Sequence, residues 1–319
     1  MAHQLSFGEA EYSIESKKSR KGVFLRKMNA VVPWSILNAI IEPYYPKVPE
    51  KAGRKPYPLE TMLRIHLLQH FYNLSDPAME SELHDSIAMR KFSKLGSLRK
   101  PTPDETTILN FRHLLEKNEL SRRIFDAINK YLGDKGLRFS GGSIVDATMI
   151  DAPSSTKNRS NSRDPEMHST KKGNQYYFGE KIHIGVDAQS GAIHSVAVTS
   201  ANVHDIAMTD EVIREKDKYV FADSGYRGIS KRTRHKNVAF LVSMMRSKRK
   251  QWKGTLLDDF EKLKSSIRSK VEHAFRILKD QFNYRKVRYR GLYKNTQAAY
   301  LKCGLINLYK FRNYLLSRA

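Results

Sequence analysis

The sequence predicts a mixed α/β protein in which a mostly helical N-terminal part, residues 1–139, is followed by a strand-rich part, residues 140–319. Three observations lead to this prediction. Before residue 139, apolar residues recur every three or four positions, as on one face of a helix. After Gly141-Gly142, short β-branched and apolar segments replace that pattern. Farther along, helical segments alternate with strands, which is typical of α/β folds.

The composition excludes several classes of protein. Of the 319 residues, 40% are hydrophobic, which is enough for a packed core and excludes global disorder. No apolar run approaches the roughly 18 residues of a membrane span. The single cysteine, Cys303, excludes an intramolecular disulfide framework and a multi-cysteine zinc site. The first residues, MAHQLSFGEAEYSIE, hold no apolar secretion signal, so we expect a cytoplasmic protein.

The charge is strongly positive. The chain has 57 Lys and Arg against 33 Asp and Glu, which gives a formal net charge of +24. This exceeds what solubility requires and indicates a polyanionic partner. A membrane-surface protein would gather its charge on an amphipathic helix or a tail, whereas here basic residues occur along the whole chain. DNA or RNA is therefore the expected partner, and no membrane is.

The N-terminal part predicts an arm, a linker and several helices. Residues 1–30 are polar and basic and are expected to form a flexible or partly helical arm. Residues 42–58 hold five prolines and read as an extended linker. Apolar spacing predicts helices over 59–74, from Ser75 to about 93, after Thr102, and over about 121–132.

Two of these helices have clear start signals. Ser75-Asp76-Pro77 places a capping residue before a proline in the first turn. Thr102-Pro103-Asp104-Glu105 predicts that Thr102 caps the next helix, with Pro103 in the first turn and Glu105 completing a capping box.

The C-terminal part predicts five strands. They are expected at 143–150, 177–187, 192–200, 218–223 and 238–244. Between the strands we expect a polar loop over 151–176, a tight turn at 189–191, a helix over 205–214 and a helix or basic loop after Ser230. After the last strand we expect a basic loop over 247–254 and a long helix over about 256–282. The first three strands form an antiparallel meander, and helices link the later two. This succession is the order of a ribonuclease-H-like mixed sheet.

Three acidic residues occupy suggestive positions. Asp146 lies inside an apolar strand, where an unpaired carboxylate costs several kcal/mol. Asp223 ends a strand, where sites of α/β proteins usually lie. Glu272 lies on the last long helix. Ordinary alternatives exist, namely a core carboxylate bonded to a backbone amide, a turn cap and a solvated surface residue. Together, however, three carboxylates would supply hard oxygen ligands for magnesium.

The helix around Glu272 carries two stripes. One is apolar and contains Ile267, Val271, Ala274, Phe275, Leu278 and Phe282. The other holds Glu272 together with the cations Arg268, Arg276 and Lys279. Such a stripe can be a set of helix-stabilising ion pairs, and it is also the arrangement that a metal site facing a phosphate backbone requires. Two magnesium ions could then support an in-line phosphoryl transfer.

At this point the sequence resembles insertion-sequence DDE transposases of the group typified by bacterial insertion sequence five. The matching stretches are GRKPYPLETMLRIHLLQHFYNLSDPAME (53–80), TTILNFRHLLE (106–116), VDATMIDAPSSTK (145–157), DPEMHSTKKGNQYYFGEKIHIGVDAQSG (164–191), NVHD (202–205), ADSGYRG (222–228) and RSKVEHAFRILKDQF (268–282). They cover nearly the entire chain. The resemblance implies a ribonuclease-H-like catalytic domain at 140–319 with a basic C-terminal tail, and a helical domain at 1–139 that binds DNA ends.

The resemblance also implies the chemistry. It assigns Asp146, Asp223 and Glu272 as the catalytic triad and the metal ligands, with Mg²⁺ as cofactor and Mn²⁺ able to replace it. The relatives' Y-x2-R-x3-E-x6-K signature has Arg268, Glu272 and Lys279 at the matching spacing, while Ser265 stands at the tyrosine position. The 49 positions between Asp223 and Glu272 leave no room for a large inserted domain. Synapsis of two ends implies a homodimer or a larger assembly on DNA.

Further residues are DNA-contact candidates. Arg268, Arg276 and Lys279 lie on the long helix, Lys171 and Lys172 in the loop before the second strand, and Lys250 and Trp252 in the basic loop. Trp252 could stack on an unpaired base or anchor the loop to the core. The tail 281–319 has nine Lys and Arg and no acid.

Other polar residues have simpler interpretations. Asp151 more readily opens the loop than joins the site, and His204-Asp205 more readily caps a helix than positions substrate. His183 and His194 are expected to be ordinary strand residues. Two alternatives to a transposase remain, a structure-specific DNA nuclease on the same fold and a domesticated DNA-binding protein without catalysis.

Overall fold

The computed structural model describes residues 19–47, 55–96, 101–139, 141–159 and 161–318. The chain divides into two compact units. The first comprises residues 1–128 together with 308–319, and the second comprises residues 129–307. Residues 1–18 of the expected arm and 48–54 of the expected linker lie outside the described residues. The functional division into an end-binding and a catalytic domain stays a prediction.

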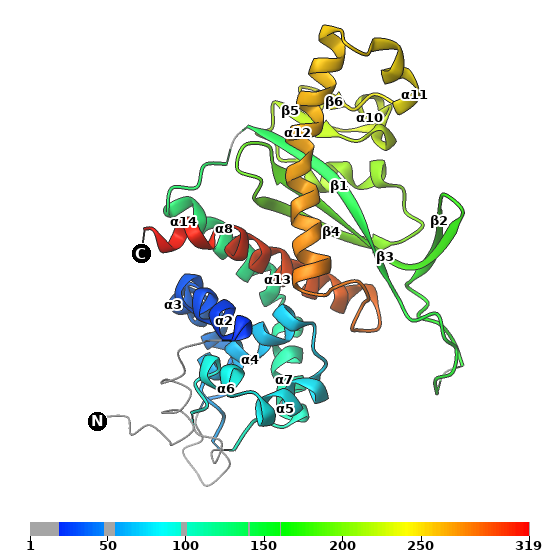
Figure 1. Ribbon diagram of the computed structural model, residues 1–319. Coiled ribbons are helices and arrows are strands. Elements are labelled where there is room, and N and C mark those ends of the chain that lie inside the picture. The colour runs from blue at the N-terminus through cyan, green and yellow to red at the C-terminus, as the bar shows by residue number, and fades with distance from the viewer. Residues whose placement is uncertain (1–18, 48–54, 97–100, 140, 160, 319) are drawn as a thin grey trace. The chain divides into compact units, whose positions relative to one another are not determined.

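The described part of the first unit is helical (Figure 1). Its elements are α2 (Arg20–Val31), α3 (Trp34–Ile41), η1 (Glu42–Tyr44), α4 (Leu59–Tyr72), α5 (Asp76–Asp85), α6 (Ile87–Phe92), α7 (Glu105–Lys117), the larger part of α8 (Leu120–Asp134) and α14 (Arg312–Leu316). Helix α4 is buried on all sides, since every residue from Thr61 to Phe71 is buried. The predicted helical N-terminal part is confirmed.

The helix starts correct two details. Ser75 caps α5 as predicted, and its hydroxyl accepts a bond from Ala78 N at 3.3 Å. The helix expected to reach residue 93 is instead broken at Ser86, whose hydroxyl caps α6. The prediction that Thr102 caps the next helix is wrong. Asp104 is the cap, because its carboxylate accepts from Thr107 N at 2.7 Å, and the Thr102 hydroxyl instead bonds His84 at 3.1 Å.

The second unit is built on a six-stranded mixed sheet (Figure 1). The strands are β1 (Gly142–Asp151), β2 (His168–Lys172), β3 (Gln175–Asp187), β4 (Ile193–Ser200), β5 (Tyr219–Ala222) and β6 (Ala239–Val242). The order is β2-β3-β1-β5-β6, and β4 pairs with β3. Strands β1, β3 and β4 are antiparallel, whereas β5 runs parallel to both β1 and β6. All five predicted strands and the meander are confirmed.

One strand was not predicted. Residues 168–172, expected to be part of a polar loop, form β2 and pair with the start of β3. Gly173 has φ of +62°, which allows the tight turn between these strands. Because β2 is polar on both faces, its sequence carries no hydrophobic alternation by which to recognise it.

Short helical segments connect the strands. They are η2 (Asp205–Met208), α9 (Thr209–Val212), η3 (Ser224–Tyr226), α10 (Ile229–Arg232), α11 (Arg246–Arg249) and η4 (Lys250–Trp252). The basic loop expected over 247–254 therefore contains helical turns. The long helix is confirmed as α12 (Leu256–Arg276), which continues into the π-turn η5 (Ile277–Gln281).

The C-terminal segment is not a tail. Residues 292–310 form α13, and every residue from Leu301 to Leu308 is buried. Lys302 lies 4.5 Å from the centre of the Tyr284 ring, and burial lowers the pKa of its ammonium to about 7. Lys302 is thus a core residue. None of the described helices is long and apolar enough to cross a membrane.

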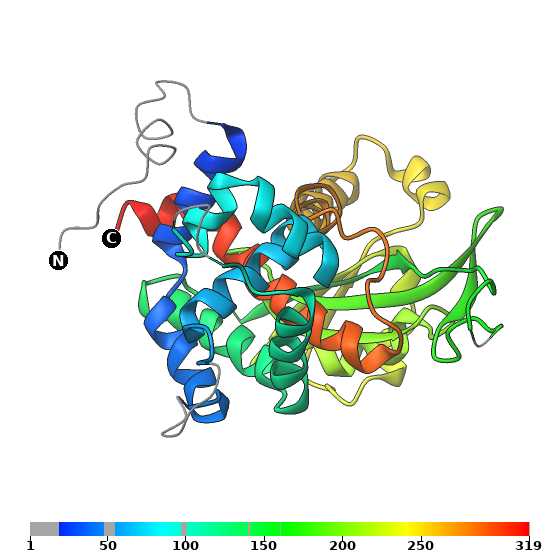
Figure 2. The same cartoon turned by 90° about the horizontal axis from the view of Figure 1, so that it is seen from below.

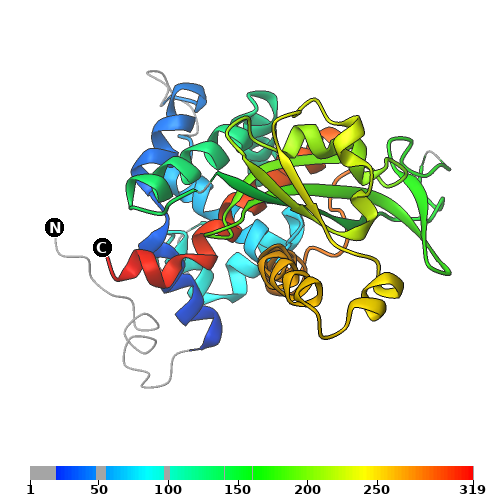
Figure 3. The same ribbon diagram turned by 90° about the horizontal axis from the view of Figure 1, so that it is seen from above.

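Helix α12 packs against β1 and β5. Figures 2 and 3 look along this helix and show it to one side of the sheet. A hydrophobic cluster fills the side of β1 to which Val145 contributes; its other members include Ile206, Val212, Tyr226 and Ile229 from the short helical segments. The two faces of β1 therefore meet different elements, as the period of two of a strand requires.

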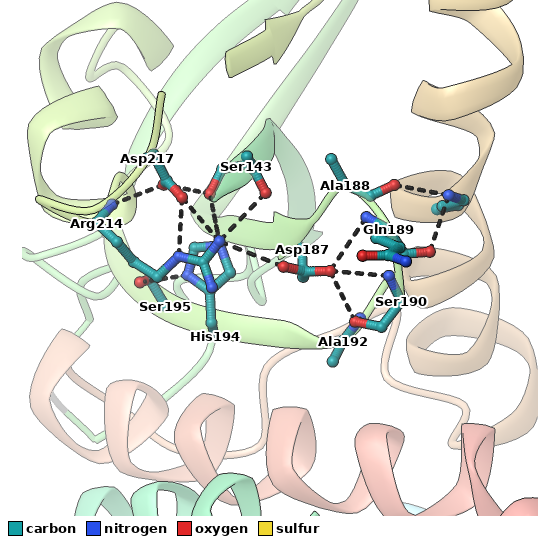
Figure 4. Close-up of polar contacts among 12 residues, drawn as sticks. Ser143, Asp187, Ala188, Gln189, Ser190, Ala192, His194, Ser195, Arg214 and Asp217 are labelled. Atoms are coloured by element: carbon teal, nitrogen blue, oxygen red, sulfur yellow. Dashed lines mark hydrogen bonds and ion pairs between the residues drawn. The ribbon is translucent and has the colours of Figure 1, made fainter. Parts of the chain in front are cut away.

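A buried polar network fixes the starting end of β1 (Figure 4). The Ser143 hydroxyl bonds both the Asp217 carboxylate and His194 Nε2, the latter at 2.8 Å. Arg214 donates to Asp217 at 2.7 Å and to Asp187 at 3.3 Å. Burial, followed by the charge of Arg214, holds the pKa of His194 well below its usual range. The network joins the starts of β1 and β5 to the turn after β3.

Replacing Asp217 with alanine should destabilise the fold strongly. The change leaves the Arg214 guanidinium without its nearest carboxylate in a site where Asp217 is fully buried, and breaking such a pair costs about 3–5 kcal/mol. Urea unfolding measures this loss. Glu211→Ala is the control, because Glu211 and Arg234 are exposed and 4.0 Å apart; it should change the free energy of unfolding by less than about 0.5 kcal/mol. Equal effects of the two substitutions would contradict the network's role.

Candidate active site

The pairing of two parallel strands places Asp146 beside Asp223. In the register of β1 with β5, Ile144 pairs with Phe221. Asp146 and Asp223 each follow two residues later, on strands that run in the same direction. The charge of Asp223 accordingly raises the pKa of Asp146. The structure therefore brings together two of the three predicted carboxylates at the carboxyl end of β5.

The Asp146 carboxylate is in an unfavourable environment for a negative charge. Its side chain is 21% exposed. Burial raises the pKa of Asp146 to about 6, and the carboxylates of Asp223 and Asp205 add to the increase. Two groups oppose it: Ala147 N donates to Oδ1 at 2.8 Å, and the Arg268 guanidinium lies 3.9 Å from Oδ2. A cation at this position would lower the free energy of the charged form.

Asp223 has a second, structural role. It is the N-cap of η3, and its Oδ1 accepts from Gly225 N at 2.8 Å. The turn-cap interpretation and the site interpretation are therefore compatible. A Cβ atom at Gly225 would lie only 3.0 Å from this oxygen. Glycine at this position lets the backbone approach the carboxylate closely.

Two further residues near the pair, Tyr226 and Asp205, were not assigned to the site from the sequence. Tyr226 is buried, and burial, followed by the charges of Asp146, Asp205 and Asp223, raises its pKa above the ordinary range. Asp205 accepts from Lys181 Nζ at 2.9 Å. Asp205 belongs to the NVHD stretch (202–205), but we interpreted His204-Asp205 as a helix cap and therefore did not assign Asp205 to the site. That interpretation is correct for His204, whose Nδ1 accepts from Ile206 N at 3.3 Å.

His183 and His194 are strand residues, as expected, whereas Asp151, which was expected to open the loop, is the last residue of β1. His183 bonds the Thr199 hydroxyl at 2.9 Å, and burial lowers its pKa to about 4. Asp151 ends β1 and joins a parallel bridge, in which Asp151 N donates to Arg285 O at 3.0 Å and Val287 N donates to Asp151 O at 2.8 Å. Its exposed carboxylate lies five residues from Asp146.

The third predicted carboxylate, Glu272, lies on α12. Arg268, which approaches Asp146, lies one helical turn before Glu272, about 6 Å along the helix axis. The Glu272 side chain itself is exposed. In the part of the chain that the structure describes, no three His, Cys, Asp or Glu side chains are close enough to hold a metal ion together. The three-carboxylate site stays a prediction.

Glu261, another acid on α12, has a structural role. It is buried, forms an ion pair with Lys264, and accepts from Met244 N at 2.9 Å. Lys264 in turn donates to Val242 O at 2.9 Å. These bonds tie the first half of α12 to the end of β6 and leave Glu272 as the candidate on this helix.

The DNA-contact candidates occupy different environments. Arg268 is half-buried and also approaches the Ser243 hydroxyl at 3.5 Å, so it faces the carboxylates. Arg276 is exposed and Lys279 half-buried. Trp252 and Lys250 are exposed on η4, where 43% of Trp252 is accessible. Lys171 and Lys172 lie on β2, and the Lys171 ammonium lies 5.4 Å from the Tyr176 ring centre.

Two family models match the chain. Residues 138–308 match the family described as "Transposase DDE domain", and residues 12–114 match the one described as "Transposase domain (DUF772)". The class defined by these matches is a DNA-cleaving and strand-transfer enzyme. More particularly, the chain belongs to the DDE transposase family. No solved structure matches the chain.

Enzymes of this family use divalent metal ions, generally Mg²⁺, and the residues present fit such an ion. Asp146 and Asp223 are hard oxygen donors from adjacent strand ends. The raised pKa of Asp146 indicates unfavourable negative charge that a cation would relieve. Glu272, exposed one turn from Arg268, is available as a third oxygen donor if its side chain turns toward the pair.

Without divalent cations, Asp146 should make the folded chain less stable as pH rises. Its pKa is raised from 3.8 to about 6 on folding, so the folded chain retains a proton that the unfolded chain has lost. Its contribution to the free energy of unfolding should fall by up to about 3 kcal/mol between pH 4 and pH 7. Urea unfolding of wild type and Asp146→Asn across this range measures the difference. A difference that does not vary with pH would contradict the raised pKa.

Proposed function

We propose that this chain is an insertion-sequence transposase of the group typified by insertion sequence five. It binds the terminal inverted repeats of its element, cleaves phosphodiester bonds there and joins the exposed 3′-hydroxyls to target DNA. The observation that carries the proposal is the parallel register of β1 with β5, which places Asp146 beside Asp223, together with the approach of Arg268 on α12 to Asp146.

We further propose that the second unit has a ribonuclease-H-like fold. Its sheet supports this assignment. Strands β4, β3 and β1 form the antiparallel meander, and β5 and β6 follow in parallel on the other side of β1. The match of residues 138–308 to the DDE domain supports it further. The helical first unit is then the candidate for recognition of the element's ends.

In the proposed reaction, Asp146, Asp223 and Glu272 hold Mg²⁺, or Mn²⁺ in its place. Bound there, the ions supply an activated oxygen nucleophile and stabilise the leaving oxygen of an in-line displacement. Asp146 and Asp223 must be ionised to bind a cation, and the buried Tyr226 lies near them. Arg268 is positioned to neutralise Asp146 before the cation binds and to approach a DNA phosphate afterwards.

The DNA itself is held by cations away from the carboxylates. The net charge of +24 supports a strongly electrostatic interaction. Arg276, Lys279, Lys250, Lys171 and Lys172 are the proposed phosphate contacts, and Trp252 the proposed contact with an unpaired base. The exposed ring of Trp252 supports this role, since it leaves the indole available for stacking.

We propose that the chain acts as a homodimer or a larger assembly on DNA, because two ends must be joined in one complex. The first half of α12 supports self-association. Leu256, Phe260 and Leu263 follow one another at helical spacing, and their exposed fractions are 89%, 45% and 55%. Apolar side chains in such a cluster are typical of interaction surfaces.

Replacing any one of the three carboxylates with its amide should abolish cleavage and joining by several orders of magnitude. Asp146→Asn, Asp223→Asn and Glu272→Gln each remove a proposed metal ligand. Cleavage of a labelled repeat end with Mg²⁺ measures the loss, and a gel shift with Ca²⁺ should show unchanged binding. Asp280→Asn is the control on η5, because Asp280 is exposed and pairs with Arg285. Near-normal cleavage by Glu272→Gln would exclude Glu272 from the site. Cleavage without joining by the wild type would favour the nuclease, and binding without cleavage the domesticated protein.

Trp252→Ala should reduce cleavage or joining while leaving thermal stability almost unchanged. The reason is that the ring is 43% exposed and lies in a short 3-10 turn. Thermal melting and the repeat-end assay are measured on the same preparation. A melting temperature lowered by more than about 5 °C would identify Trp252 as an anchor of the loop.

A further inference from the structure

A cavity of about 220 Å³ lies in the second unit, away from the carboxylate pair. One wall is the segment that follows β1, residues 153–164, and the other is the segment that precedes α13, residues 287–290. Pockets for drug-sized ligands measure about 300–1,000 Å³. This cavity is therefore too small for a whole cofactor and is of the size expected for a phosphate group with part of its sugar.

Three arginines line the cavity. Arg163 comes from the first wall, and Arg288 and Arg290 come from the second. All three are exposed, so their guanidinium groups are accessible to a ligand. Arg163 Nε donates to Ser154 O at 2.9 Å, which holds its side chain in place. Guanidinium groups match the geometry of phosphate oxygens better than any other side chain.

The one carboxylate among the residues that line the cavity, that of Asp164, already accepts backbone hydrogen bonds. Asp164 Oδ2 accepts from Gly291 N at 2.7 Å, and Oδ1 accepts from Glu166 N at 3.1 Å. Glu166 likewise accepts from Leu292 N at 2.7 Å. These acids thus complete the backbone hydrogen bonds at the start of α13. The cavity keeps an excess of positive charge, which favours an anion.

The two walls are held together by backbone hydrogen bonds. The bridge of Asp151 with the segment around Lys286 joins the end of β1 to the second wall. The bonds of Asp164 and Glu166 to the start of α13 join the walls again at the other side. Gly291 has φ of +90°, a conformation that favours glycine, and a Cβ there would lie 3.4 Å from Glu166. The cavity is therefore formed before a ligand binds.

The distance from the carboxylates to the cavity can be estimated along the chain. From Asp146 to Pro153, the first lining residue, the chain advances seven residues, most of them along β1. At about 3.3 Å per residue this is roughly 20 Å. Successive base pairs of B-DNA are about 3.4 Å apart, so for a duplex that runs along β1 this distance spans about six base pairs.

We propose that this cavity, lined by Arg163, Arg288 and Arg290, binds one phosphate of the DNA substrate about six base pairs from the cleaved bond. The proposal rests on the proposed function, because it assumes that cleavage occurs at Asp146. It adds a preformed contact that fixes the register of the duplex relative to the site. Arg163 is not among the predicted DNA-contact residues, and Arg288 and Arg290 were predicted only as part of the basic segment 281–319.

The test compares Arg288→Gln/Arg290→Gln with a matched control, Lys216→Gln/Lys218→Gln. Each double variant removes two positive charges. Lys216 and Lys218 are exposed at the start of β5, at the opposite end of that strand from Asp223. Affinity for a labelled duplex carrying the end of the encoding element is measured in Ca²⁺ at several salt concentrations. Ethylation interference on the same duplex locates individual phosphate contacts. Thermal melting confirms that both doubles are folded.

We expect the arginine double to bind about tenfold more weakly and its salt slope to fall by about 0.9, the value for one phosphate. Interference at one phosphate about six base pairs from the cleaved bond should disappear in this double alone. Arg288→Lys/Arg290→Lys keeps both charges and should retain most of the slope. If the arginine double matches the control in affinity, slope and interference, the cavity is not a phosphate site. Cleavage by the wild type would then still support the proposed function. Absence of cleavage by the wild type would refute the proposed function, independently of the cavity.

Discussion

The short parallel pairing between β1 and β5 is the constraint on which the candidate site depends. The paired register ends at Ile144 and Phe221, and β1 continues beyond it as the partner of β3 alone. Asp146 therefore lies just past the last paired residue, beside the residue that ends β5. The buried network of Ser143, Asp217 and Arg214 fixes the starting ends of both strands. A slip of one residue between the strands would turn the Asp146 side chain to the opposite face.

The free-energy cost of placing acids here explains the neighbouring cation. Burial of Asp146, followed by the charges of Asp223 and Asp205, raises the pKa of Asp146 and so the free energy of its charged form. Arg268 offsets part of this cost from 3.9 Å, although the distance exceeds that of a direct hydrogen bond. Helix α12 thus contributes a cation to the site, and it carries Glu272 one turn away.

The positive charge of the chain is distributed more unevenly than its composition suggests. Several cations lie in the interior; they are Arg64, Arg90, Arg112, Lys264 and Lys302. Arg64, for example, donates to Phe92 O at 2.8 Å, and Lys264 donates to Val242 O. The cations that remain on the surface include the three arginines of the cavity after β1. Net charge therefore predicts the class of partner, whereas the positions of contact depend on which cations the fold leaves exposed.

The sequence by itself determined the elements that local patterns encode. Period-two and helical spacing identified the five main strands and α12, the Ser75 cap followed from its proline, and the family followed from motifs that span most of the chain. What depends on distant residues was decided by the tertiary structure. The sequence could not distinguish Thr102 from Asp104 as a cap, detect the polar strand β2, or show that Lys302 is buried, because each outcome depends on partners far along the chain. Likewise Asp146 and Asp223 were recognisable singly, but only the register of β1 with β5 brings them together, and only the packing of α12 places Arg268 near Asp146.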